Sequence, residues 1–156
     1  MERSNGGDRN FDDLTEKFSR KVYGGLKGDI RLAVIWRDLM SVIPEINSSQ
    51  PMRVLDVGGG LGQMSIKLAE LGHRVIYNDI SSNMLAIAKD SAVKAGVESF
   101  IEWRQCPYQD LDVEELGQFD LILCHAMIEW LDKPEQLIPK LMRHRSPNGF
   151  ISLTFY

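Results

Sequence analysis

The sequence lacks the features that would place the protein in a membrane or send it out of the cell. Nowhere does it contain a run of about 18 apolar residues, the length that a membrane-spanning helix needs. Its first ten residues are polar and do not form a secretory signal, so we expect residues 1–10 to be a disordered tail. Internal repeats and low-complexity segments are also absent. These absences favour a soluble globular domain without a membrane partner.

Cysteine and positive charge are scarce as well. The two cysteines, Cys106 and Cys124, each end a strand-like run, and free thiols favour a reducing compartment, which makes the cytoplasm the expected location. We expect no metal site. The formal net charge is −4, whereas a domain that grips nucleic acid through its phosphates usually has a basic surface. The composition argues against nucleic-acid binding by these residues, unless a part of the protein outside this sequence supplies the charge.

What the sequence does contain is, first, a helical N-terminal segment. From Arg31 to Ile43 apolar residues recur at helical spacing on one face, and Pro44 with the polar residues after it ends the helix. Residues 11–22 predict a weaker helix, and a glycine-containing joint connects the two. We therefore assign residues 11–50 to N-terminal helices and residues 51–156 to an α/β core.

From residue 52 onward, short apolar runs alternate with amphipathic stretches. This alternation predicts right-handed βαβ units and a parallel sheet. The expected fold class is α/β, a Rossmann-like doubly wound and mostly parallel sheet. We expect strands at 52–57, 74–78, 100–105, 119–124 and 150–156, and helices at 63–71, 83–95 and 134–144. Because the sequence stops inside the fifth strand and leaves an apolar edge, we expect it to be the first part of a longer protein.

The most informative stretch follows the first strand and is rich in glycine, with Gly58, Gly59, Gly60 and Gly62. Glycine is needed where a strand turns sharply into a helix and a ligand packs against the main chain. A GxGxxG dinucleotide loop that starts at Gly58 would need glycine at the position of Gln63. The spacing GxGxG after an acidic residue is instead typical of proteins that bind S-adenosylmethionine, which has no pyrophosphate for a helix N-terminus to hold. A glycine-rich turn without a ligand is the alternative.

Two acidic residues accompany this loop. Asp79 ends the second strand, and in a doubly wound sheet its carboxylate lies beside the glycine loop, where it can accept hydrogen bonds from both ribose hydroxyls. The same acid would serve NAD, and a carboxylate that caps the following helix, near Ser81, is the structural alternative. Asp56 is expected to orient the loop, or to meet an ammonium group through water, rather than to catalyse.

Further candidate residues follow the third and fourth strands. Gln109 or the backbone of Tyr108 lies where it would read the edge of an adenine, and a surface aromatic is the alternative for Tyr108. His125 closes the fourth strand. Because ligands bind at the carboxyl ends of parallel strands, His125 should face the cofactor or the substrate. A structural histidine with its hydrogen bonds satisfied is the other interpretation.

Together these motifs resemble the class I S-adenosylmethionine-dependent methyltransferases. The resemblance rests on residues 54–62, on Asp79 and on residues 125–130. More narrowly, residues 9–13, 16–20, 23–24 and 27–28 resemble the N-terminus of the bacterial tRNA 5-carboxymethoxyuridine methyltransferases, and the match continues to Tyr156. The glycine motif is specific only to the superfamily, whereas the N-terminal stretches are specific to the subfamily.

The resemblance implies methyl transfer from S-adenosyl-L-methionine to the carboxylate of 5-carboxymethoxyuridine at the tRNA wobble position, with the N-terminal helices covering the cofactor site. A guanidinium such as that of Arg31 can hold the methionine carboxylate bidentately, with a solvated surface charge as the alternative. Family members continue past this length, so the region that binds tRNA would lie in the part that is missing. The residues implied to contact the cofactor are Arg31, Gly58, Gly59, Gly60, Asp79, Tyr108, Gln109 and His125.

Methyl transfer to a carboxylate needs no general base, because the acceptor is ionised at neutral pH. Rate enhancement then comes from aligning the reacting atoms, and we predict no indispensable acid–base residue. For a phenol or carbon-acid acceptor, His125 becomes a candidate base. A small-molecule methyltransferase on the same fold and a truncated module that binds cofactor without catalysis remain alternatives. An NAD oxidoreductase is disfavoured by Gln63.

Overall fold

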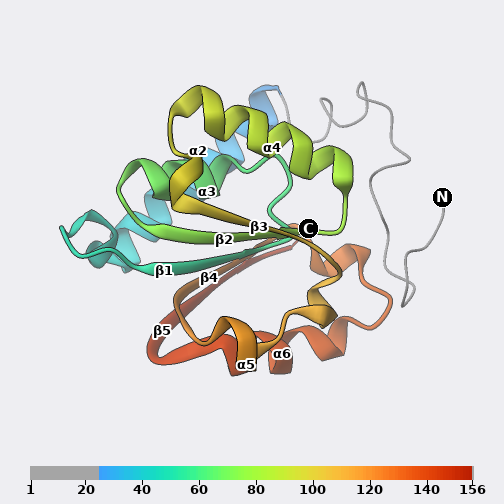
Figure 1. The fold of residues 1–156 in the computed structure, drawn as a ribbon. Coiled ribbons are helices and arrows are strands. Elements are labelled where there is room, and N and C mark those ends of the chain that lie inside the picture. The colour runs from blue at the N-terminus through green and yellow to red at the C-terminus, as the bar shows by residue number, and fades with distance from the viewer. Residues whose placement is uncertain (1–24, 156) are drawn as a thin grey trace.

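The computed structural model describes residues 25–155, which form a five-stranded sheet with helices on both faces (Figure 1). The sheet order is β3-β2-β1-β4-β5, and every neighbouring pair of strands is parallel. The strand order reverses between β1 and β4, and open α/β sheets bind ligands at the carboxyl ends of the strands beside such a reversal. The strands are β1 (Arg53–Val57), β2 (Arg74–Asp79), β3 (Ile101–Gln105), β4 (Phe119–His125) and β5 (Arg145–Thr154).

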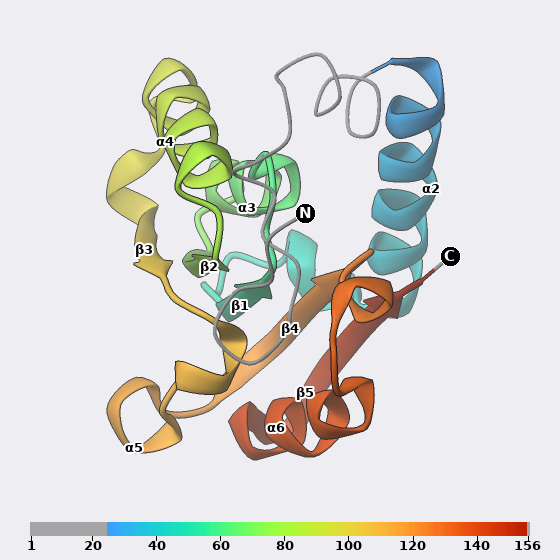
Figure 2. The ribbon, with the colours of Figure 1, turned by 90° about the vertical axis from the view of Figure 1, so that its right-hand side faces the viewer.

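Two helical layers cover this sheet. The layer on one face consists of α2 (Leu26–Val42), α3 (Gln63–Glu70) and α4 (Ser82–Ala95), and the layer on the other of α5 (Val113–Leu116) and α6 (Leu137–His144), as Figures 1 and 2 show. Successive side chains of a strand point to opposite faces, so each strand serves both layers. In β1, Val54 belongs to the apolar cluster that contains Leu68, and Leu55 to the cluster that contains Leu137. This double burial explains why the strands are nearly continuous apolar runs.

The predicted fold class is confirmed, and most element boundaries agree within two residues. The helix expected at 31–43 begins earlier, at Leu26. The non-helical residue before it is Gly25, whose φ is 94°, and not Gly28. The helix expected at 134–144 begins with a 3-10 turn and becomes α-helical at Leu137. β5 starts before the expected residue 150, in an irregular stretch where its register against β4 shifts. The predicted tail at 1–10 and helix at 11–22 lie outside the described residues.

The short connections that the sequence did not predict are single helical turns. Besides α5, there are 3-10 turns at Pro44–Asn47, Glu98–Phe100, Tyr108–Asp110, Ile128–Trp130 and Pro134–Gln136. Turns of this length carry too few residues for a helical periodicity to show in the sequence. Two of them, Tyr108–Asp110 and Ile128–Trp130, directly follow the segments at the carboxyl ends of β3 and β4 and therefore lie near the expected site.

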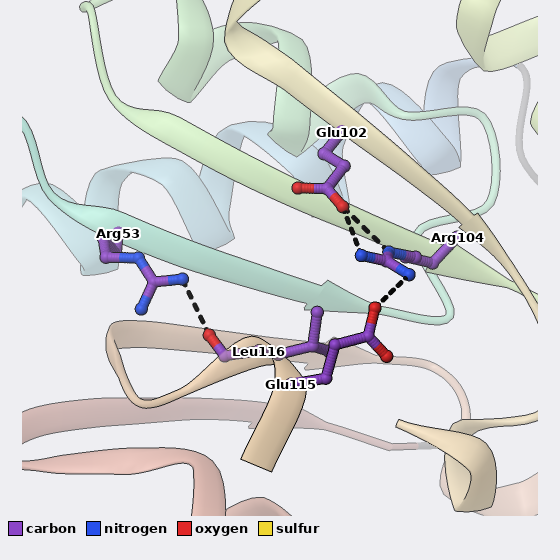
Figure 3. Close-up of polar contacts among 5 residues, drawn as sticks. All are labelled: Arg53, Glu102, Arg104, Glu115 and Leu116. Carbon is purple, nitrogen blue, oxygen red and sulfur yellow. Dashed lines mark hydrogen bonds and ion pairs between the residues drawn. The ribbon is translucent and has the colours of Figure 1, made fainter. Parts of the chain in front are cut away.

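Two arginines, at the start of β1 and near the end of β3, link α5 to the sheet (Figure 3). Arg53 of β1 donates a hydrogen bond from its guanidinium to the carbonyl oxygen of Leu116, the last residue of α5, at 2.8 Å. Arg104 of β3 forms ion pairs with Glu102 of the same strand and Glu115 of α5. Exposed ion pairs stabilise a fold little. The hydrogen bond from Arg53 is therefore the more important of these contacts, because a carbonyl in the last turn of a helix has no partner within the helix.

Candidate functional site

The loop between β1 and α3 presents its main chain where other loops present side chains. Gly58 and Gly60 have φ angles of 66° and 57°, in the left-handed region that other residues rarely adopt. A Cβ atom on Gly58 would lie 2.6 Å from the sulfur of Met127, and one on Gly59 would collide with the ring of Tyr77. Glycine is therefore required in this loop both by conformation and by lack of space.

Asp79 holds this loop in place from the end of β2. Its Oδ2 accepts a hydrogen bond from the backbone N–H of Gly60 at 2.9 Å, and its Oδ1 accepts one from that of Ser81 at 2.9 Å. The cap of α4 is Ser81, whose hydroxyl accepts a hydrogen bond from the N–H of Met84. The alternative that Asp79 caps this helix is therefore wrong. The carboxylate is instead buried and fixed beside the glycine loop.

Asp56, in β1, is buried beneath the same loop. Ser65 of α3 donates a hydrogen bond to its Oδ2 at 2.7 Å. Burial raises the pKa of the Asp56 carboxyl to about 6; the hydrogen bond from Ser65 acts in the opposite direction, and the charge of Asp79 adds to the rise. A cationic group beside Asp56 would favour its ionised form. The position therefore suits the ammonium group of an amino-acid ligand.

Two adjoining hollows lie along the carboxyl ends of the strands. The first has a volume of about 60 Å³ and is lined on the side of β2 and β3 by Asp79 and Tyr108. The second, of about 170 Å³, lies between α2 and the end of β4 and is lined by Arg31 and His125. The two hollows form one crevice, because they share Gly58, Gly60, Ala126 and Trp130.

Where β4 ends, the backbone makes a strained turn into this crevice. Ala126 has a φ of 54° and is the one non-glycine residue with a positive φ between residues 25 and 155. Its N–H donates to the carbonyl oxygen of Thr154 at 3.0 Å. In the preceding residue, His125, Nε2 lies 2.8 Å from the hydroxyl of Ser152, and burial lowers the pKa of the imidazole to about 4. His125 is therefore neutral at pH 7 and faces the second hollow.

The structure places most of the predicted contact residues around the crevice. Gln109 is not among the lining residues, and its carbonyl oxygen accepts a hydrogen bond from Lys140 Nζ of α6 at 3.0 Å. Tyr108 is buried, so the alternative that it is a surface aromatic is wrong. The predicted residues that do line the crevice are Arg31, Gly58, Gly59, Gly60, Asp79, Tyr108 and His125.

Asn78 and Trp130 are among the crevice residues that the sequence analysis did not assign to the site. Asn78 lines the first hollow, and its side-chain amide donates to the carbonyl oxygen of Cys106 at 2.8 Å, which ties the end of β2 to the segment after β3. Trp130 lines both hollows. In the sequence, Asn78 directly precedes Asp79 and Trp130 shortly follows His125. That position suggests that each residue lies near the site, but it does not show which way the side chain points.

Neither a membrane-spanning helix nor a metal cluster occurs between residues 25 and 155. None of the helices between residues 25 and 155 is long and apolar enough to cross a membrane. In that part of the chain, no three histidine, cysteine, aspartate or glutamate side chains gather as a metal site requires. Cys106 and Cys124 are both free thiols.

Comparison with known proteins supports the class that this crevice indicates. Residues 55–153 match a family model described as a methyltransferase domain. The tRNA 5-carboxymethoxyuridine methyltransferase of Escherichia coli K12 is 45% identical over 149 residues, which cover 96% of this chain and 57% of the relative. The ubiquinone biosynthesis O-methyltransferase of Bordetella avium is 33% identical over 104 residues, 67% of this chain and 42% of the relative.

A solved structure extends the comparison to the fold. The crystal structure of magnesium protoporphyrin IX methyltransferase from Synechocystis PCC 6803 with bound SAM aligns with a TM-score of 0.69 at 22% identity. The alignment covers 87% of this chain and 68% of that one. At this level of identity the likeness concerns the fold alone.

The fold is that of the class I S-adenosylmethionine-dependent methyltransferases, as the sequence predicted. The chain belongs to the methyltransferase domain family. This membership confirms, at the level of the family, the predicted cofactor S-adenosyl-L-methionine. The chain spans 57% of the length of the Escherichia coli relative.

Proposed function

We propose that this chain binds S-adenosylmethionine in the crevice and transfers its methyl group to the carboxylate of 5-carboxymethoxyuridine in tRNA, which gives the methyl ester. The observation that carries this proposal is the 45% identity over 149 residues to a tRNA 5-carboxymethoxyuridine methyltransferase. That identity extends over 96% of the chain and is well above the 33% to a relative named for ubiquinone biosynthesis. The proposal includes tRNA as the partner and the cytoplasm as the location.

The crevice fits a ligand with a nucleoside at one end and an amino acid at the other. In the first hollow, the N–H groups of Gly60 and Ser81 orient the Asp79 carboxylate, which suits the paired hydroxyls of a ribose. In the second hollow, Arg31 and Asp56 offer opposite charges for the carboxylate and the ammonium of an amino acid. The wall common to both hollows includes Gly58 and Gly60, so the ligand can lie against the main chain there.

The bound cofactor supplies a methyl group that the positive charge of its sulfonium activates. The residues of the chain need only bind and orient, because a carboxylate acceptor is ionised at pH 7. His125 is neutral at that pH and faces the second hollow, where it can position the reactants by hydrogen bonding. Catalysis then rests on aligning the acceptor oxygen, the methyl carbon and the sulfur.

Cofactor binding is tested by calorimetric titration of the chain with S-adenosylmethionine and with NAD. We expect S-adenosylmethionine alone to bind. Asp79→Ala should weaken its binding by about 100-fold, because hydrogen bonds to a charged group contribute about 1.5–3 kcal/mol each. Asp110→Ala, which removes an exposed carboxylate nearby, is the matched control and should bind as the wild type does.

The loop contact of Asp79 calls for a second measurement. Because Asp79 also anchors Gly60, the thermal unfolding of the Asp79→Ala variant is followed alongside its affinity. A variant that stays folded and binds S-adenosylmethionine like the wild type would contradict the role of Asp79. A folded wild-type chain that binds no S-adenosylmethionine would overturn the proposed function.

The acceptor is tested separately, since the identity to a ubiquinone biosynthesis O-methyltransferase favours a small phenolic acceptor as the second candidate. The chain is incubated with S-adenosylmethionine and either tRNA that carries 5-carboxymethoxyuridine or a catechol, and the products are identified by mass spectrometry. Methyl ester in the tRNA, without methylated catechol, supports the proposal. The opposite result supports the small-molecule enzyme, and cofactor binding without either product supports a binding module.

A further inference from the structure

The end of β5 contacts two crevice residues, the last residue of β4 and the one after it, through two hydroxyl groups. The Oγ of Ser152 lies 2.8 Å from Nε2 of His125, and the Oγ1 of Thr154 lies 3.2 Å from the backbone nitrogen of Ala126. Ser152 and Thr154 are two residues apart on one strand, so their side chains point to the same face of β5. Neither residue lines the crevice, whereas both of their partners do. The two hydroxyls therefore contact residues of the crevice lining without lining the crevice themselves.

We propose that Ser152 is a positioning residue for the crevice, which acts through His125 by holding its imidazole in one ring orientation, with Nε2 directed toward β5. The inference rests on the proposed function, because it concerns how the same crevice binds S-adenosylmethionine. A neutral imidazole has one N–H donor and one acceptor nitrogen. A serine hydroxyl can donate to Nε2 or accept from it, so in either tautomer its hydrogen bond keeps Nε2 directed toward β5.

The surroundings of His125 give this contact its importance. The ring is half-buried and lines the hollow that also contains Arg31 and Asp56. Burial disfavours the charged imidazolium, so the ring acts as a neutral group whose donor and acceptor sides differ. A ring that turned over would present a different hydrogen-bonding group to the hollow. The contact with Ser152 opposes that rotation.

The backbone beside His125 is held from the same strand. Ala126 has a φ of 54°, and such strain persists only where the surroundings enforce it. The carbonyl oxygen of Thr154 accepts the Ala126 N–H at 3.0 Å, and its hydroxyl lies near the same nitrogen. β5 thus fixes the main chain of the turn through Thr154 and the side chain at its start through Ser152. This arrangement explains how a residue outside the crevice can shape it.

The first test is calorimetry on three variants of the full chain. Ser152→Ala should weaken S-adenosylmethionine binding roughly three- to tenfold, the range expected when one hydrogen bond is lost. Ser152→Thr keeps the hydroxyl on a residue that strands favour, and it should bind within about twofold of the wild type. Ser146→Ala, near the opposite end of β5, is the matched control and should leave the affinity unchanged.

The second test reads the ring orientation directly, by NMR of the chain with isotope-labelled histidine at pH 7, from nuclear Overhauser contacts between the His125 ring protons and β5. The wild type and Ser152→Thr should show one ring orientation for His125, and Ser152→Ala more than one. A Ser152→Ala variant with wild-type affinity would overturn the proposal, and so would one with reduced affinity but a single, unchanged ring orientation. Failure of the proposed function would appear differently, as a wild-type chain that binds no S-adenosylmethionine.

Discussion

The two ends of the sheet contain similar residues but use them differently, and their histidines show this best. At the amino ends, His73 is fully buried, its Nδ1 accepts the N–H of Met52 at 2.9 Å, and its Nε2 donates to the carbonyl oxygen of Ile46 at 2.7 Å. At the carboxyl ends, His125 has a partner in Ser152 and faces a hollow. A histidine whose two nitrogens have fixed backbone partners stabilises the fold. One that faces a hollow can serve a ligand.

The glycines differ between the two ends in the same way. Gly72, just before β2 begins, has a φ of 89°, and a Cβ atom there would meet nothing within 4 Å. Gly58, just after β1 ends, has a φ of 66°, and a Cβ atom there would meet the side chain of Met127. Both positions need glycine for conformation, but only Gly58 is also crowded. For this pair of glycines, crowding by a neighbouring side chain distinguishes the end of the sheet that contains the crevice.

The largest effect should come from the buried histidine. His73→Ala should lower the free energy of unfolding by about 3 kcal/mol, because it leaves the N–H of Met52 and the carbonyl of Ile46 without partners and opens a cavity. Urea denaturation measures this loss. His125→Ala is the matched control at the other end and should cost about 1 kcal/mol or less while weakening S-adenosylmethionine binding. Equal losses of unfolding free energy in the two variants would contradict the proposed difference between the two ends of the sheet.

Asp56 should make the crevice end dependent on pH. Its carboxyl has a folded pKa of about 6, against an unfolded value of 3.8. As the pH rises from about 4 to about 6, the unfolded chain loses this proton first, so the free energy of unfolding falls, by at most about 3 kcal/mol. The Asp56→Asn side chain cannot ionise, so the free energy of unfolding of this variant should not show that decrease. Urea denaturation at several pH values checks the difference between the two proteins.

A carboxylate at the amino end of β4 provides the control for this experiment. Asp120 accepts a hydrogen bond from the backbone N–H of Arg53 at 2.8 Å, in an exposed position. Asp120→Asn should therefore keep the wild-type fall in stability between pH 4 and pH 6, whatever its effect on stability itself. If Asp56→Asn showed the same pH dependence as the wild type, the buried carboxylate would not be the group that titrates there.

The sequence predicted the features that depend on local pattern. The alternation of strands and helices gave the fold class, and the glycine spacing with Asp79 gave the position of the crevice. Each of these signals lies within a short stretch, because a strand, its turn and the acid after it are consecutive in the chain. Right-handed crossovers then bring such consecutive units together at one end of the sheet.

The features that the sequence did not predict depend on distant partners or on conformation. His73 and His125 could not be assigned contrasting roles, because their partners Met52 and Ser152 are 21 and 27 positions away. The strained turn at Ala126 gave no signal, since alanine is not a residue that favours a positive φ. Gln109 lies in the predicted loop but outside the crevice lining, since a loop's position does not fix the direction of its side chains.

The smallest effect separates the two glycines. Gly72→Ala should lower the free energy of unfolding by about 1 kcal/mol, the cost of a left-handed conformation for a residue with a Cβ, and leave S-adenosylmethionine affinity unchanged. Gly58→Ala carries the same cost and should lose about 0.5–1 kcal/mol more, because the flexible thioether of Met127 must move. That movement alters the crevice, so Gly58→Ala should also weaken binding. Adding Met127→Ala to Gly58→Ala removes the colliding sulfur, and if affinity then rises toward that of Met127→Ala alone, crowding rather than conformation distinguishes the carboxyl end.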